Sequence, residues 1–142
     1  MIRHFTMEDY DEVYQLWKAT PGMGLRSLDD SKEGIAKFIS RNPSTNFVAV
    51  ENGSIIGTVL SGHDGRRGFL YHTCVKASCQ RRSIGRKLVE KVIAAMQQEG
   101  IMKLSLVCFS DNENGNQFWE SLGWINREEL NFYSFSIFEG EH

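Results

Sequence analysis

The sequence has few of the features that mark secreted, membrane-bound or repetitive chains. It contains three cysteines in 142 residues, Cys74, Cys79 and Cys108, and their spacing matches no zinc module. Two prolines, no Ser/Gly tract and no internal repeat indicate neither a linker nor a solenoid. Nowhere does the sequence have the run of about 18 apolar residues that a membrane span needs. Its first residues also lack the apolar core of a signal peptide. We therefore expect one domain over residues 1–142, in a reducing cytoplasm, with no membrane partner and no metal.

The sequence also lacks an excess of charge of either sign. Sixteen Lys and Arg residues stand against 18 Asp and Glu residues, which gives a formal net charge of -2. A chain with this balance has no overall positive field that would hold nucleic acid, so any anion site must be local. The hydrophobic content of 41% is enough for an ordinary core.

Apolar residues recur at helical spacing in four segments, which predicts about four helices. The segments are 10–17, 35–39, 84–96 and 118–122. Strands are predicted at 1–5, 47–50, 55–60, 69–75, 103–109, 124–127 and 131–138. Asn52-Gly53 is typical of a type I′ hairpin turn, and the helix at 84–96 joins two strands that we expect to be parallel. The fold class is α/β, with a mixed, mostly antiparallel sheet of six to seven strands around a central parallel strand-helix-strand unit. Residues 139–142 are expected to fray.

The strongest local motif is the junction between the strand at 69–75 and the helix that begins near Ser83. A helix N-terminus presents unpaired N–H groups and a partial positive charge, so this turn can hold a phosphate. Arg81, Arg82 and Arg86 add formal positive charge. The glycine fingerprints of a dinucleotide fold and of a P-loop are both missing. An ordinary basic helix start and an anion site are equally compatible with the spacing alone.

Two segments in order resemble one family. Residues 80–85, Gln-Arg-Arg-Ser-Ile-Gly, are similar to the Q/R-x-x-G-x-G/A pyrophosphate loop of the GCN5-related N-acetyltransferases (GNAT). Residues 112–124 resemble the N-x-x-A-x-x-F-Y-x-x-x-G-F segment of the same family. The order of strands and helices also fits, so the resemblance covers nearly the whole chain. Residues 57–59 and 63–68 are most similar to small bacterial acetyltransferases of unassigned substrate.

The resemblance implies direct transfer of an acetyl group from acetyl-CoA to a primary amine while both substrates are bound. The pyrophosphate is then expected on the turn from Gln80 to Gly85, and the pantetheine arm is expected beside Cys74 and Val75, where a backbone N–H would polarise the thioester. Asn112 is expected to hydrogen-bond the cofactor arm. The cofactor-binding residues implied in this way are Cys74, Val75, Gln80, Arg81, Arg82, Ser83, Ile84, Gly85, Arg86, Asn112 and Trp119.

Three residues depart from the family pattern. Ser83 replaces a glycine, which is acceptable if its φ is negative. Gly115 replaces an alanine, which by helix propensity should weaken its helix by about 0.8–1 kcal/mol. Trp119 occupies the position of the tyrosine that often serves as general acid, and an indole N–H donates a hydrogen bond but has no accessible proton to give up. We expect Trp119 to contribute shape by packing against the acyl-bearing arm.

The catalytic base and acid are less well defined. The strand at 69–75 lacks the glutamate that the family often uses, and His72 is the nearest side chain with a suitable pKa. Tyr71, His63 and Asp64 are alternatives that would act through a water, and His72 could equally be a hydrogen-bonded histidine of the sheet. We expect the base function to be shared. Tyr133, on a terminal aromatic strand, is the alternative acid, although such strands more often belong to the core. A cysteine acyl-enzyme is disfavoured because no activating base accompanies it.

The acceptor is a small-molecule amine or a protein amine, and the loops at 20–30 and 61–68 would decide between them. An alternative function is an acyl-CoA-binding sensor without turnover, which the missing acid and base residues suggest. A basic-helix nucleic-acid binder is a weaker alternative that the balanced charge opposes. A homodimer is the default assembly.

Overall fold

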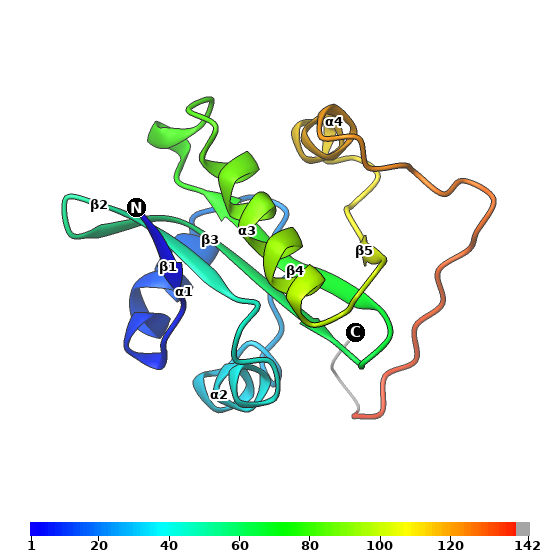
Figure 1. The fold of residues 1–142 in the computed structure, drawn as a ribbon, viewed down its shortest axis with the longest axis horizontal. Helices are drawn as coiled ribbons and strands as arrows, with labels where there is room; N and C mark the ends of the chain where they lie inside the picture. Colours follow the sequence, from blue (N-terminus) through cyan, green and yellow to red (C-terminus); the bar gives the residue numbers. More distant parts are fainter. Residues whose placement is uncertain (139–142) are drawn as a thin grey trace.

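The structure is a computed structural model, and it describes residues 1–138 as one five-stranded sheet with helices on both faces (Figure 1). The strands lie in sequence order, and β5 alone is parallel to its neighbour, β4. Their bounds are β1 Ile2–His4, β2 Phe47–Glu51, β3 Ser54–His63, β4 Gly68–Val75 and β5 Leu104–Leu106. The predicted α/β class and the parallel β4–β5 pair are thus confirmed. Residues 139–142, expected to fray, lie outside the described part of the chain.

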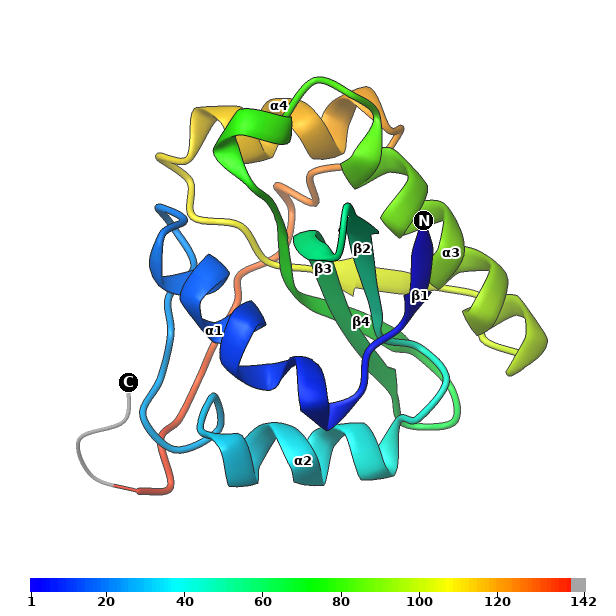
Figure 2. The ribbon, with the colours of Figure 1, turned by 90° about the vertical axis from the view of Figure 1, so that its left-hand side faces the viewer.

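Four α-helices flank the sheet, with α1 and α2 on one face and α3 on the other (Figure 2). Their bounds are α1 Tyr10–Lys18, α2 Lys32–Arg41, α3 Ile84–Gln98 and α4 Glu113–Ser121, with short 3-10 turns at Met7–Asp9 and Ala77–Cys79. The turn between β2 and β3 has positive φ at Asn52 (52°) and Gly53 (77°), so the predicted type I′ hairpin is confirmed.

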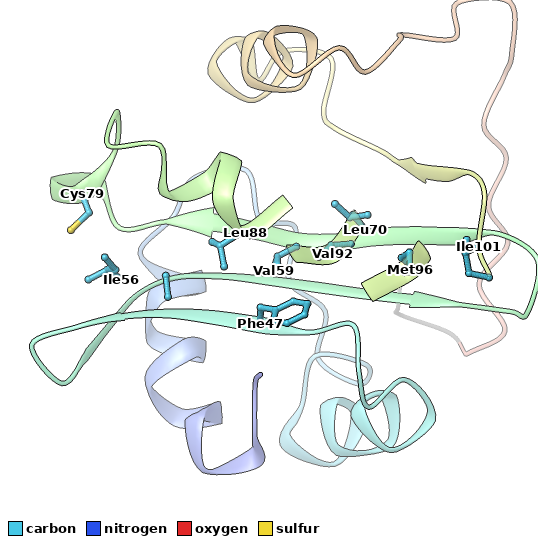
Figure 3. Close-up of a cluster of buried hydrophobic side chains, with 10 residues drawn as sticks. Phe47, Ile56, Val59, Leu70, Cys79, Leu88, Val92, Met96 and Ile101 are labelled. Carbon is cyan, nitrogen blue, oxygen red and sulfur yellow. The ribbon is translucent and has the colours of Figure 1, made fainter. Parts of the chain in front are cut away.

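Each face of the sheet has its own apolar core. On one face, α3 places Leu88, Val92 and Met96 against Val59 and Leu70 (Figure 3). On the other face, a second cluster joins α1 and α2 to the sheet through Val13, Trp17, Ile35, Val48, Leu60 and Cys74. A fully buried side chain of this size contributes about 1.5–3 kcal/mol, so α1 and α3 are fixed on opposite sides of β4.

A β-bulge in β4 alters which face its side chains occupy. Val59 of β3 pairs with Thr73 of β4, and Ser61 pairs with Leu70. Between these two pairs, β4 has two residues, Tyr71 and His72, whereas β3 has only Leu60. Both bulged side chains contact the face of α1 and α2. The Tyr71 ring lies 5.4 Å from the Phe38 ring, and the His72 ring lies 4.8 Å from the Trp17 ring. The bulge therefore turns a polar ring out of the α3 core and towards α1.

The last two predicted strands, at 124–127 and 131–138, are wrong. The described residues there form no strand, and the sheet has five strands instead of six to seven. Figure 1 shows this extended segment running outside the sheet, with Phe135 91% and Ile137 87% exposed. Aromatic and β-branched residues favour strands only where a neighbouring backbone pairs with them. The segment therefore has the composition of a strand but no neighbouring strand to pair with. β5, at Leu104–Leu106, is also shorter than the strand predicted at 103–109.

Among residues 1–138, no helix combines the length and apolar character needed to cross a bilayer.

Gly115 is closely packed at the start of α4. The Asn112 side chain caps this helix by accepting the Gly115 N–H at 3.0 Å. A Cβ at position 115 would lie 2.7 Å from Asn112 Nδ2 and 3.0 Å from Cys108 Sγ. The glycine therefore permits both the cap and the approach of the β5–α4 connection, which outweighs its poor helix propensity.

We expect Gly115→Ala to lower the free energy of unfolding by about 1 kcal/mol, because overpacking outweighs the gain in helix propensity. Urea denaturation measures this change. Gln117→Ala, at an exposed position of the same helix, is the matched control and should change stability by less than about 0.5 kcal/mol. A more stable Gly115→Ala protein would contradict this explanation of the glycine.

Candidate functional site

Half of β4 has an open edge. β5 pairs with β4 only from Gly68 to Leu70, whereas β4 continues to Val75 while still paired with β3. Figure 1 shows the chain after β5 turning away from β4 towards α4. No described strand pairs with Cys74 and Val75 on that side. Unpaired backbone groups at a sheet edge can pair with an extended ligand, as the family resemblance implies for these two residues.

The open edge leads directly into the N-terminus of α3. Ser83, the N-cap residue, makes no side-chain hydrogen bond to the helix, and its carbonyl accepts the Lys87 N–H. The first-turn N–H groups, including those of Ile84 and Gly85, therefore have no capping side chain. Arg81 and Ser83 both have positive φ, at 66° and 65°. Turns with left-handed residues gather N–H groups into concavities that bind anions.

The side chains of this turn have different partners. The Gln80 side-chain amide donates to the Val75 carbonyl at 3.2 Å, which ties the turn to the end of β4. Arg82 pairs with Glu51 of β2, and this contact lowers the pKa of the Glu51 carboxyl. Arg82 is therefore directed to the hairpin, whereas Arg81 and Arg86 are exposed beside the helix start.

Gly85 serves the packing of two helices. A Cβ there would lie 3.0 Å from the Phe118 ring of α4. The absence of a side chain lets α4 approach the start of α3, in addition to any role in phosphate approach. A bulky substitution at Gly85 would therefore disturb both features.

α4 forms the other wall of the opening. Asn112, expected to contact the cofactor arm, uses its carbonyl oxygen to cap α4. Trp119 is half-buried, with its ring 5.0 Å from Trp124 and 4.9 Å from Phe118. It packs against the same core as α3, which is consistent with a role in shape.

His72 lies on the α1 side of β4 and contacts a residue that the sequence analysis did not single out for chemistry. Its Nε2 lies 2.6 Å from Oδ1 of Asp30, in the connection between α1 and α2. Asp30 is 6% exposed. The two residues are 42 positions apart, and Asp30 sits at an ordinary helix-start position, so no local pattern could have paired them.

The alternative bases are unsuited to this position. His63 is the last residue of β3 and pairs with Gly68, which lies about 13 Å along β4 from His72 at about 3.3 Å per residue, and Asp64 follows in the β3–β4 turn. The His63 Nε2 contacts Glu99, and backbone N–H groups of Arg66 and Arg67 lower the pKa of Asp64. Burial raises the pKa of the Tyr71 phenol, which keeps it protonated at neutral pH.

The structure places Tyr133 in solvent and the Cys74 thiol in the core. Tyr133 is 86% exposed on the extended segment after α4, so its ring is not packed in the opening beside β4. Burial raises the pKa of Cys74 to about 12, which leaves almost no thiolate at neutral pH. Within residues 1–138, no group of three or more His, Cys, Asp or Glu side chains could hold a metal ion.

A hollow lies between the α1–α2 connection and the start of α4. It is lined by Pro21, Gly22, Phe109 and residues 111–114. A Cβ at Gly22 would lie 3.1 Å from Asn112 Nδ2, so the two segments are in close contact. Asp111 and Glu113 place two carboxylates on this hollow, which gives it an acidic rim.

Comparisons with known proteins identify the family and support the fold. Residues 10–124 match the family model described as the acetyltransferase (GNAT) family. The structure of Ard1 from Thermoplasma volcanium has a TM-score of 0.78 and 17% identity, over 88% of this chain and 82% of that one. An aminoglycoside acetyltransferase from an uncultured soil metagenomic sample, in complex with sisomicin, has a TM-score of 0.77 and 19% identity, over 96% and 95%.

A third solved structure contains coenzyme A. It is the PaiA N-acetyltransferase from Thermoplasma acidophilum, with a TM-score of 0.73 and 21% identity, over 86% of this chain and 87% of that one. At such identities these likenesses establish the fold.

The left-handed conformation of Ser83 corrects the expectation of a negative φ. The side chain is tolerated at φ 65°, but this conformation disfavours residues with a Cβ. We expect Ser83→Gly to raise the free energy of unfolding by up to about 1 kcal/mol, because relief of strain exceeds the added entropy of the unfolded chain. Thermal denaturation measures the change, and Ser83→Ala is the control that should bring no gain. Equal changes in stability in the two variants would contradict the claim that the left-handed conformation of Ser83 is strained.

Proposed function

The chain belongs to the acetyltransferase (GNAT) family, and we propose that residues 1–142 form a single N-acetyltransferase domain that moves an acetyl group from acetyl-CoA to a primary amine. The observation that carries this proposal is the unpaired half of β4 leading directly into the uncapped N-terminus of α3. This arrangement matches an elongated ligand that has an extended, amide-containing arm and phosphates at one end.

The phosphate end of acetyl-CoA fits the turn at 80–85. The first-turn N–H groups of α3 and its helix dipole favour an anion, and Arg81 and Arg86 supply formal charge. The pantetheine arm carries amide groups that can pair with the open edge beside Cys74 and Val75. Ile84 and Trp119 offer half-buried apolar surface on the two sides of this path.

His72 is the side chain best suited to take the proton of the amine. An alkyl ammonium titrates near ~10.4, so an amine must lose a proton to attack at neutral pH. Acetyl-CoA supplies the acetyl group as a thioester. The nitrogen of the neutral amine forms a bond to the acetyl carbon, the carbon–sulfur bond breaks so that coenzyme A leaves as its thiolate, and the N–H proton released as the amide forms passes to His72. A backbone N–H near Cys74 or Val75 would stabilise charge on the carbonyl oxygen.

Direct transfer is favoured over an acyl-enzyme. The pKa of the Cys74 thiol, about 12, opposes its use as a nucleophile, and burial also raises the pKa of Cys108. A thiolate leaving group of pKa about 8.5 departs acceptably without a proton donor, so the tryptophan at position 119 is compatible with turnover.

The acceptor would enter from the side of the α1–α2 connection. Asp111 and Glu113 give the hollow there an acidic rim, which suits a cationic amine. A panel of small amines and peptides, assayed by thiol release from acetyl-CoA, tests the function and the acceptor class together. Amine-dependent thiol release supports the enzyme. Tight acetyl-CoA binding without release for any amine would favour the alternative, a non-catalytic acyl-CoA sensor.

We expect His72→Ala to lower kcat by 10² to 10⁴-fold, the usual contribution of a general base, while acetyl-CoA affinity stays within about twofold. Steady-state kinetics and calorimetry measure the two quantities. His63→Ala, which removes a histidine of β3 opposite the far end of β4, is the control and should leave kcat unchanged. Equal kcat values for the two variants would remove His72 from the mechanism.

We expect Trp119→Phe to keep most of kcat, because the ring contributes shape and not a proton. Trp119→Ala should weaken acetyl-CoA binding by opening a cavity beside Phe118 and Trp124. Calorimetric titration of acetyl-CoA into each folded variant measures this. An inactive Trp119→Phe protein that still binds acetyl-CoA would make the indole N–H catalytic.

A further inference from the structure

We propose that Asp30 is a positioning residue that fixes His72 in the protonation pattern required of a general base. This inference rests on the proposed acetyl transfer, because His72 must have a proton to accept. It adds a residue from the α1–α2 connection to the site.

The contact between the two side chains is short and largely shielded from water. The distance from Asp30 Oδ1 to His72 Nε2 is 2.6 Å, and the two side chains are 8% and 15% exposed. Trp17 of α1, which is fully buried, lies edge-on to the imidazole with 4.8 Å between ring centroids. Low exposure strengthens a hydrogen bond to a charged group, since less water competes for it.

The position of the carboxylate is fixed independently of His72. Its second oxygen, Oδ2, accepts the backbone N–H of Arg26 at 2.7 Å. The backbone carbonyl of the same residue, Asp30, accepts the Tyr10 hydroxyl at 2.7 Å. Asp30 is therefore held both by the backbone of its own loop, at Arg26, and by α1, at Tyr10. A side chain held at both oxygens can define the orientation of the ring that it contacts.

This geometry determines which imidazole nitrogen has the free electron pair. An ionised carboxylate only accepts hydrogen bonds, so Nε2 of His72 must be the protonated nitrogen. Nδ1 then has the lone pair, so it is the ring nitrogen that would accept a proton. When an amine proton moves to Nδ1, the ring becomes an imidazolium whose positive charge Asp30 stabilises.

The α1–α2 connection, which contains Asp30, also borders the hollow at the start of α4. Gly22 contacts Asn112, and a Cβ at Gly24 would lie 3.4 Å from the Phe109 ring. Asp30 therefore belongs to the segment along which an amine would enter. A single connection thus both orients His72 and shapes the acceptor side.

The experiment compares Asp30→Asn with Asp29→Asn. Both variants remove one negative charge from the same loop, but Asp29 is exposed, and the carboxylate that contacts His72 belongs to Asp30. Steady-state kinetics give kcat and the KM for acetyl-CoA, and long-range ¹H–¹⁵N NMR spectra report which ring nitrogen of neutral His72 is protonated. The NMR measurement on the unaltered protein needs no variant, so it remains decisive if Asp30→Asn fails to fold.

We expect neutral His72 to carry its proton on Nε2 in the unaltered protein. Asp30→Asn should lower kcat about 100-fold and leave the KM for acetyl-CoA within about twofold, because the amide disturbs the ring and no longer stabilises its charge. Asp29→Asn should leave kcat unchanged. A proton on Nδ1 in the unaltered protein, or equal kcat values for the two variants, would overturn the assignment. Absence of thiol release with every amine would instead refute the proposed function, and the NMR result would still decide the pairing.

Discussion

The parting of β4 from β5 after Leu70 is the constraint on which the candidate site depends. A strand buried within a sheet has no free backbone groups, whereas β4 keeps an open edge over its last residues. α3 begins just beyond this edge, so groups for an extended ligand and groups for an anion follow one another along the chain. The cores on the two faces of the sheet hold the helices in place, because Leu88 and Val92 fix α3 and Trp17 fixes α1.

The bulge in β4 determines which face of the sheet His72 occupies. A regular strand would alternate strictly, and Tyr71 and His72 would point to opposite faces of the sheet. With the extra residue, both contact the side of α1 and α2. The open edge of β4 thus leads to α3, whereas the imidazole lies on the side of the sheet that faces the α1–α2 connection. In the proposed function, this separation would let acetyl-CoA and the amine approach the same strand from different directions.

Local sequence patterns predicted the elements with strong periodicity and clear ends. The amphipathic face of α3, the Asn52-Gly53 turn and the parallel β4–β5 pair were all readable, because each depends on residues close together in the chain or on a short connection. The strands expected at 124–127 and 131–138 were wrong because a strand needs a partner, which propensity does not reveal. The contact of Asp30 with His72 and the need for Gly115 depend on packing between distant segments, and the left-handed Ser83 depends on the turn as a whole.

An amide NMR titration with acetyl-CoA tests most directly whether the open edge and the start of α3 form one binding site. The geometry predicts that the largest chemical-shift changes occur at residues 74–75 and 84–86, with little change in the β3–β4 turn at 64–67. Changes confined to other surfaces, such as the hollow beside Met1 and Lys87, would contradict this placement of the site.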